Sequence, residues 1–141
     1  PHTTYALKVL YPKYTGIEFD VKTYFELIDF EARDGNSQVT LHDPCFYGRY
    51  LELSDKPREI LDRFGIDHVE VRNSGKFTHC CGGPAESISP SLTQEILSKR
   101  YASLQETGKP ILAMCPVCLG NLQKIGADVE DLSVFLARYA K

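Results

Sequence analysis

Five cysteines, grouped at three places, constrain this chain more than any other feature. Cys45 stands alone, Cys80 and Cys81 are adjacent after 34 intervening residues, and Cys115 and Cys118 follow after 33 more, as the ends of a Cys-Pro-Val-Cys motif. An odd number of cysteines cannot all pair in internal disulfides. A chain of 141 residues is also long enough to bury a core without cross-links. The grouping therefore predicts one shared site.

The Cys-Pro-Val-Cys motif predicts a helix start. Pro116 suits the first helical position, and Cys115 and Cys118 then flank the free backbone N–H groups of the first turn. These groups and the helix dipole favour thiolate over thiol, and thiolate is the form that binds metals. The same spacing serves a thioredoxin-like redox pair, so this motif alone leaves both interpretations open.

The adjacent pair favours a cluster over a single ion. Cys80 and Cys81 point to opposite faces if their segment is extended, so they reach two irons of a cluster more easily than one tetrahedral ion. Gly82 and Gly83 give the backbone freedom to wrap around such a cluster and bring N–H groups to its sulfides. Zinc takes four ligands and would leave one cysteine over. Because both groups accept thiolates, zinc remains the alternative.

The apolar pattern predicts an α/β fold, a small and mostly parallel sheet flanked by helices. Strands are expected at residues 38–42, 67–71 and 110–114, with a short extended piece at 19–22. Helices are expected at residues 4–11 (stopped by Pro12 and Gly16), 24–32, 55–64, 91–106, 116–125 and 132–139, with a turn at 34–36. For the helix at residues 91–106, the buried face is expected to be Leu92, Ile96, Tyr101 and Leu104.

The predicted strands give the cysteines a common location. Cys45 and Cys115 follow the carboxyl ends of strands directly, and Cys80 follows a strand by one loop. Ligands of open α/β sheets bind at that edge. We therefore expect the three groups of cysteines to converge there.

Composition excludes some functions. The net charge of −3 and the scattered Lys and Arg residues argue against a nucleic-acid groove, and no apolar run is long enough to span a membrane. With no secretory leader and with reduced thiols, the expected location is the cytoplasm or the cytoplasmic face of a membrane complex, attached only indirectly through a partner subunit. A start at Pro1 without methionine suggests a fragment or a processed product.

Four motifs together resemble a known family: His42-Asp43-Pro44-Cys45, Gly48-Arg49, Cys80-Cys81-Gly82-Gly83 and Cys115-Pro116-Val117-Cys118. They resemble the cysteine-rich CCG domain of heterodisulfide reductases (B- and D-type subunits) and of the iron–sulfur subunits of glycolate, lactate and glycerol-3-phosphate oxidoreductases. The resemblance implies a noncubane [4Fe-4S] cluster held by Cys45, Cys80, Cys81, Cys115 and Cys118, with Gly82 and Gly83 beside it. It also implies an oxidoreductase in which this cluster passes electrons to a small disulfide or sulfur substrate.

The resemblance leaves alternatives and partners to be decided. A flavin or a ferredoxin-like iron–sulfur domain or subunit would supply the electrons. The same ligands would serve a non-catalytic electron relay in a dehydrogenase, and some family members bind zinc in a structural site. Residues 1–16 are expected to be the tail of a preceding, degenerate copy or an N-terminal helix, and residues 17–141 the iron–sulfur domain itself, because residues 1–8 align with residues 116–123.

Two histidines lie close to cysteines and are candidate catalytic residues. His79 precedes Cys80 and is preferred, while His42 lies three residues before Cys45. Either ring can donate a hydrogen bond to a cluster sulfur or protonate a thiol product. Arg49 is expected to pair with Asp43 or to offset the cluster's charge. Phe46 and Tyr47 either shield the cluster from water or belong to the core.

Overall fold

The computed structural model describes residues 1–28 and 37–139, and its centre is a four-stranded parallel sheet in the order β2-β1-β3-β4. The strands are β1 (Gln38–His42), β2 (Asp67–Val69), β3 (Ile111–Ala113) and β4 (Val129–Asp131). The prediction of an α/β fold with a parallel sheet is confirmed. The edge strand β4 was not predicted, because Val129-Glu130-Asp131 is short, half-buried and has no apolar run.

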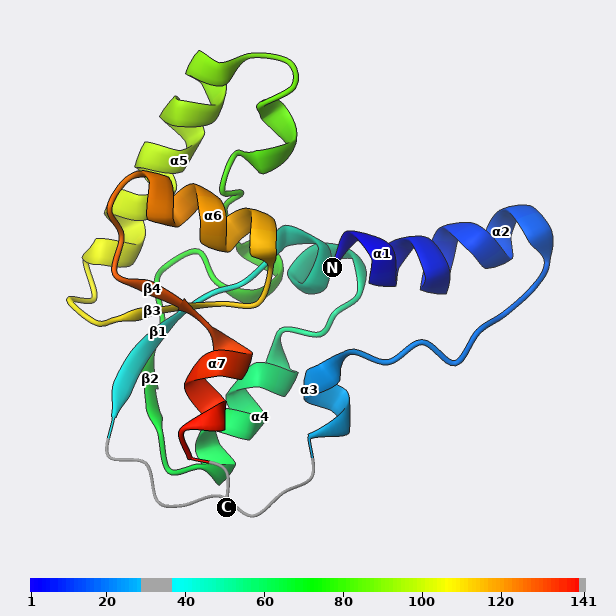
Figure 1. The fold of residues 1–141 in the computed structure, drawn as a ribbon, viewed down its shortest axis with the longest axis horizontal. Helices are drawn as coiled ribbons and strands as arrows, with labels where there is room; N and C mark the ends of the chain where they lie inside the picture. The colour runs from blue at the N-terminus through cyan, green and yellow to red at the C-terminus, as the bar shows by residue number, and fades with distance from the viewer. Residues whose placement is uncertain (29–36, 140–141) are drawn as a thin grey trace.

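Helices cover both faces of the sheet (Figure 1). On one face, α4 (Asp55–Arg63) and α7 (Leu132–Ala137) pack with the short α3 (Tyr24–Leu27) around a core that includes Leu41, Leu61 and Phe135. On the other, α5 (Pro90–Gln105) and α6 (Pro116–Lys124) pack around Leu104, Ile111 and Leu122. The residues beyond Ile28 in the predicted helix 24–32, and the predicted turn at 34–36, lie outside the described residues.

Strand β1 sends alternate side chains to these two faces, as the pleat of a strand requires. Val39 and Leu41 belong to the core on the α4 and α7 side. His42 therefore faces the α5 and α6 side, where it contacts α5 and is completely buried. A parallel sheet covered on both faces buries both sets of side chains.

Helix α5 buries a different face from the one predicted. Thr93, Leu97, Arg100 and Leu104 are its buried residues, whereas Leu92 is 45% exposed. Leu104 alone belongs to both sets. Apolar residues are spread around this helix, so their spacing did not mark the buried stripe, which contains a threonine and an arginine. This correction brings Arg100 into the interior.

Residues 1–16 form one helical segment of three parts: α1 (His2–Tyr5), a π-helical turn η1 (Ala6–Leu10) and α2 (Tyr11–Thr15). The prediction that Pro12 stops the helix is wrong. The wide π turn comes first, so Pro12 falls in the first turn of α2, where its missing N–H is not needed. Gly16, with a positive φ, ends the segment as predicted.

Short helical turns complete the loops: η2 (Phe46–Tyr50), η3 (Gly75–Phe77) and η4 (Gly83–Ala85). Residues 19–22 form no strand of the sheet. Among the described helices, none has the length and apolar character needed to cross a bilayer.

Candidate metal centre

All five cysteines line one hollow at the carboxyl edge of the sheet. Cys45 lies just beyond β1, and Cys115 lies just beyond β3 as the N-cap of α6. Cys80 and Cys81 arrive from the loop before η4. Cys118 lies in the first turn of α6. The other residues that line the hollow are Pro1, His2, Pro44, Phe46, Pro84 and Val117. Three distant segments thus meet where the strand pattern predicted.

The five thiols differ in their access to solvent. Cys81, Cys115 and Cys118 are buried and form a cluster of their own, with the Sγ atoms of Cys81 and Cys118 only 3.2 Å apart. Cys45 and Cys80 are partly exposed, and all five are free of disulfides. The hollow therefore has a deep side of three sulfurs and an open side at Cys45 and Cys80.

Two cysteines are held as thiolates by hydrogen bonds. Cys80 accepts hydrogen bonds from the thiols of Cys45 and Cys81 and from the Gly82 N–H, whose nitrogen lies 3.3 Å from its sulfur. These hydrogen bonds lower the pKa of Cys80 to about 2. Cys118 donates to Cys115 and, with the backbone N–H groups of Cys118 and Val117, lowers the pKa of Cys115 to about 6. The pKa values of Cys45 and Cys118 are raised, because these thiols are the donors. The helix start at Cys115 thus favours the metal-binding form, as predicted.

Gly82 and Gly83 carry the chain around the sulfurs. Gly82 has φ of 83°, and a Cβ there would lie 2.8 Å from the Thr93 carbonyl oxygen. A Cβ on Gly83 would lie 2.4 Å from Val117 and 3.7 Å from the Cys81 sulfur. Only glycine fits this path, so the two positions predicted beside the cluster do lie against the cysteines.

His42 and Arg100 form a buried pair behind the deep sulfurs. Arg100 Nε donates to His42 Nδ1 at 3.0 Å, and its Nη1 donates to the Asn73 carbonyl at 2.8 Å. Of the buried side-chain nitrogens and oxygens in the described residues, only His42 Nε2 and Arg100 Nη2 lack a hydrogen-bond partner. A nitrogen of His42 and the sulfurs of Cys81 and Cys118 lie within 4.8 Å of one another. The side chain of His79, the preferred histidine from the sequence, is exposed instead.

The donor set fits an anionic metal–thiolate centre. Five soft thiols suit iron–sulfur clusters and zinc alike. Behind them lies the buried guanidinium of Arg100, which forms no ion pair among the described residues. Burial lowers its pKa, while the nearby charges of Asp43, Cys118 and Cys81 act in the opposite direction. Arg100 belongs to the Lys99-Arg100 stretch that shares the family resemblance, but no role was predicted for it from the sequence. Its position could have been predicted from helical spacing, because Arg100 shares one face of the helix with Thr93, Leu97 and Leu104.

Asp43 fixes the turn into Cys45. It is buried and accepts from Arg58 and from the Gly75 N–H, while its carbonyl accepts from the Thr78 hydroxyl. Arg49 donates to the Thr78 carbonyl, so the expected pair between Arg49 and Asp43 is wrong. The network joins the Cys45 turn to the loop that leads to Cys80.

The two aromatic residues after Cys45 have different roles. Tyr47 is buried in the core on the α4 side of the sheet. Phe46 lines the hollow, where the ring of His2 packs edge-on against it with centroids 4.3 Å apart.

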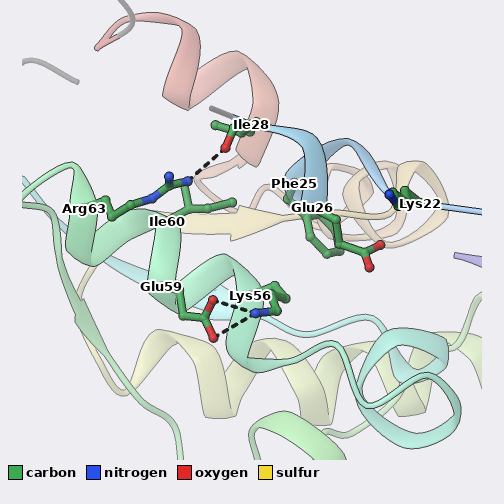
Figure 2. Close-up of a pocket in the computed structure, with 8 residues that line it drawn as sticks. All are labelled: Lys22, Phe25, Glu26, Ile28, Lys56, Glu59, Ile60 and Arg63. Atoms are coloured by element: carbon green, nitrogen blue, oxygen red, sulfur yellow. Dashed lines mark hydrogen bonds and ion pairs between the residues drawn. The ribbon is translucent and has the colours of Figure 1, made fainter. Parts of the chain in front are cut away.

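A larger pocket elsewhere has no comparable chemistry. It lies between α3 and α4 and measures about 960 Å³ against about 260 Å³ for the cysteine hollow (Figure 2). Its charges are already satisfied: Lys56 pairs with Glu59, Arg63 donates to the Ile28 carbonyl, and Glu26 accepts from Thr23. Size alone therefore does not mark the site.

Comparison with known proteins places this arrangement in a family. Residues 39–123 match the family model described as CCG, cysteine-rich domain, and this range holds all five cysteines. The chain belongs to the CCG cysteine-rich domain family. The CCG match also contains β1 from Val39 onward, all of β3 and the His42–Arg100 pair, so the family region and the candidate centre coincide. No solved structure matches the chain.

Curated relatives of this CCG domain are larger proteins. It is 30% identical over 153 residues to the D-type subunit of the dihydromethanophenazine:CoB–CoM heterodisulfide reductase of Methanosarcina acetivorans, covering 94% of this chain and 37% of that protein. It is 34% identical over 134 residues to the probable iron-sulfur-binding oxidoreductase FadF of Bacillus subtilis, covering 86% and 19%. A probable membrane-anchored ferredoxin of Chromohalobacter salexigens is 29% identical over 140 residues, covering 89% and 21%. The chain thus spans well under half of each relative.

Proposed function

We propose that this CCG domain is the electron-transfer part of an iron–sulfur oxidoreductase of the heterodisulfide reductase type. Cys45, Cys80, Cys81, Cys115 and Cys118 would hold one iron–sulfur cluster, of the noncubane [4Fe-4S] kind that the family resemblance implies. The convergence of all five thiols on one hollow carries the proposal. The names of the relatives, a heterodisulfide reductase and an iron-sulfur-binding oxidoreductase, support it.

The number of thiols favours a cluster over zinc. Four ligands complete a structural zinc site. Here the fifth thiol lines the same hollow and does not lie apart as a spare.

The open side suggests where a substrate approaches. The cluster would supply one-electron chemistry for cleaving a disulfide or sulfur substrate. Cys45 and Cys80 face the opening, next to the half-buried Phe46 and the 41% exposed Val117, so a small apolar disulfide meets these residues first. A pure electron relay would need no such opening, and that difference favours the catalytic interpretation.

Partners and location follow as parts of the same proposal. The electrons come from a flavin or from a ferredoxin-like iron–sulfur domain or subunit, and the domain works in the cytoplasm or at the cytoplasmic face of a membrane complex. Residues 1–16 are proposed to be the tail of a preceding copy. In support, the helix that starts at Pro1 and α6, which starts at Pro116, both begin at the cysteine hollow.

Metal and sulfide analysis of anaerobically purified protein tests the proposal. About four irons with an equal amount of sulfide are expected, together with reoxidation of the reduced centre by small disulfides. Cys81→Ser should alter or abolish the cluster, while the exposed control Lys99→Met should not. One zinc without sulfide would overturn the proposal, and an intact cluster that no disulfide reoxidises would reduce it to a relay.

A further inference from the structure

His42 has a fixed tautomer in this structure. The guanidinium of Arg100 carries only N–H donors and has no acceptor. Because its Nε–H points at His42 Nδ1 from 3.0 Å, that nitrogen must be the bare acceptor of the ring. A neutral imidazole then carries its proton on Nε2. Because Nδ1 accepts from Arg100, it carries no proton, and the ring is the neutral imidazole with its proton on Nε2.

The protonated Nε2 is the ring nitrogen that is left for the deep sulfurs. His42 Nδ1 is taken by Arg100, and Nε2 is buried without a partner in the described part of the chain. A ring nitrogen of His42 lies within 4.8 Å of the sulfurs of Cys81 and Cys118, and two roles toward them are open to the unpaired Nε2, a metal ligand or a hydrogen-bond donor. A nitrogen that carries its proton has no lone pair for a metal. By occupying Nδ1, Arg100 therefore decides between the two roles.

Arg100 is built for this task. It projects from the middle of α5 onto the buried face of that helix and is fully inaccessible. Its Nη1 is anchored by the Asn73 carbonyl, which orients the guanidinium toward the strand end at His42. A surface role is excluded, and no described carboxylate pairs with it.

We propose that Arg100 is a positioning residue: it holds His42 in the Nε2-protonated form, so that His42 donates a hydrogen bond to sulfur at Cys81 and Cys118 and does not ligate the metal. Hydrogen bonds to cluster sulfurs stabilise the reduced, more negative state and raise the reduction potential. The expected change in reduction potential rests on the proposed cluster, whereas the expected tautomer of His42 does not.

The tautomer is tested first, on the unaltered protein with 15N-labelled histidine. The His42 spectrum should show a bare Nδ1 and a protonated Nε2. A bare or metal-bound Nε2 would overturn the proposal. This measurement also works if the protein carries zinc, which is diamagnetic, so the tautomer can be established or refuted even where metal analysis has overturned the cluster.

Variants then test the effect on the cluster through its midpoint potential and iron content. Arg100→Met and His42→Leu should each shift the potential downward at unchanged iron content. Arg100→Met also removes a buried positive charge, so it should shift the potential further than His42→Leu does, and the double variant should shift it no further than Arg100→Met alone. His42→Gln keeps an N–H donor and should recover most of the shift. Lys99→Met, which removes a charge from the neighbouring exposed position of α5, is the control and should change nothing.

Two results would overturn the proposal. Loss of iron in His42→Leu with retention of iron in Lys99→Met would make His42 a ligand. An unchanged potential in His42→Leu would show that the pair is only structural. If Arg100→Met fails to fold, Arg100→Lys keeps the charge but not the planar donor, and its 15N spectrum should show loss of the single tautomer.

Discussion

Arg58 donates to both carboxylate oxygens of Asp43, each from 2.9 Å, and so ties α4 to the turn that carries Cys45. The pair is bidentate, the geometry in which an arginine–carboxylate contact is strongest. Asp43 also accepts from the Gly75 N–H at 2.7 Å, which links the same turn to the loop before Cys80. One carboxylate therefore sets the distance between two of the three cysteine segments.

Asp43→Asn should destabilise the fold. The amide keeps the shape but loses the charge and one acceptor, and Arg58 is left with a weakened partner. Breaking one side of a buried pair costs about 3 kcal/mol of the free energy of unfolding. Urea denaturation of the purified protein measures this cost. Lys99→Met should leave the midpoint where it was, and an equal loss in that control would refute a specific role for Asp43.

Acid should weaken the fold partly through Glu70. Burial raises the pKa of Glu70, but its hydrogen bonds and ion pair with Arg58 outweigh this and leave the pKa below the ordinary 4.5. A carboxylate whose pKa is lower in the folded state stabilises the fold at any pH above its pKa in the unfolded state. This stabilisation is lost as the pH falls through the pKa of the folded state. The stability of Glu70→Gln should therefore depend less on pH below about 4.5. Identical acid profiles for both proteins would contradict the shift.

Gly82→Ala should be more harmful than its backbone angle alone explains. A positive φ costs an alanine about 1–2 kcal/mol. Gly126 has φ of 76° with open space around it, whereas at Gly82 the new Cβ would also lie 2.8 Å from the Thr93 carbonyl oxygen. Gly126→Ala is thus the matched control for strain alone. Equal losses of unfolding free energy in the two variants would show that the contact with Thr93 relaxes easily.

The buried face of α5 can be checked by paired truncations. Leu97 is 2% exposed and Leu92 is 45% exposed. Leu97→Ala should lower the free energy of unfolding by about 3 kcal/mol, since it leaves a cavity, while Leu92→Ala should cost far less. If chemical denaturation shows a larger loss of unfolding free energy for Leu92→Ala than for Leu97→Ala, the buried face of α5 is the one predicted from the apolar spacing.

The sequence was sufficient for the arrangement of the cysteines and for most of the sheet. β1 was predicted residue for residue, because its apolar residues Val39 and Leu41 alternate with polar ones and turn residues bound it on both sides. Parallel strands then placed Cys45 and Cys115 at one edge without any knowledge of side chains. Strand β4 was missed because its three residues take their strand geometry from pairing with β3, not from their own pattern.

The environment of the cysteines was harder to predict. His79 was preferred for its nearness to Cys80 in the sequence, and its role stays a prediction, yet its side chain is exposed. His42 is farther than His79 from the nearest cysteine in the sequence. In the fold, however, one of its ring nitrogens lies within 4.8 Å of the sulfurs of Cys81 and Cys118. The burial of Arg100 was not predicted for a related reason, since a buried arginine on a helix breaks the apolar pattern. Partners from separate elements have no local signature.

The order of the strands also sets the order of events during synthesis. β1 pairs with β3, which is synthesised much later. Cys45, which follows β1, leaves the ribosome 70 residues before Cys115, which follows β3. At typical translation speeds that interval lasts roughly 4–14 s. Throughout it Cys45, and later Cys80 and Cys81, have no α6 to cover them. Their thiols are open to oxidants during this interval, and the proposed five-cysteine cluster can be completed only after translation has passed Cys118.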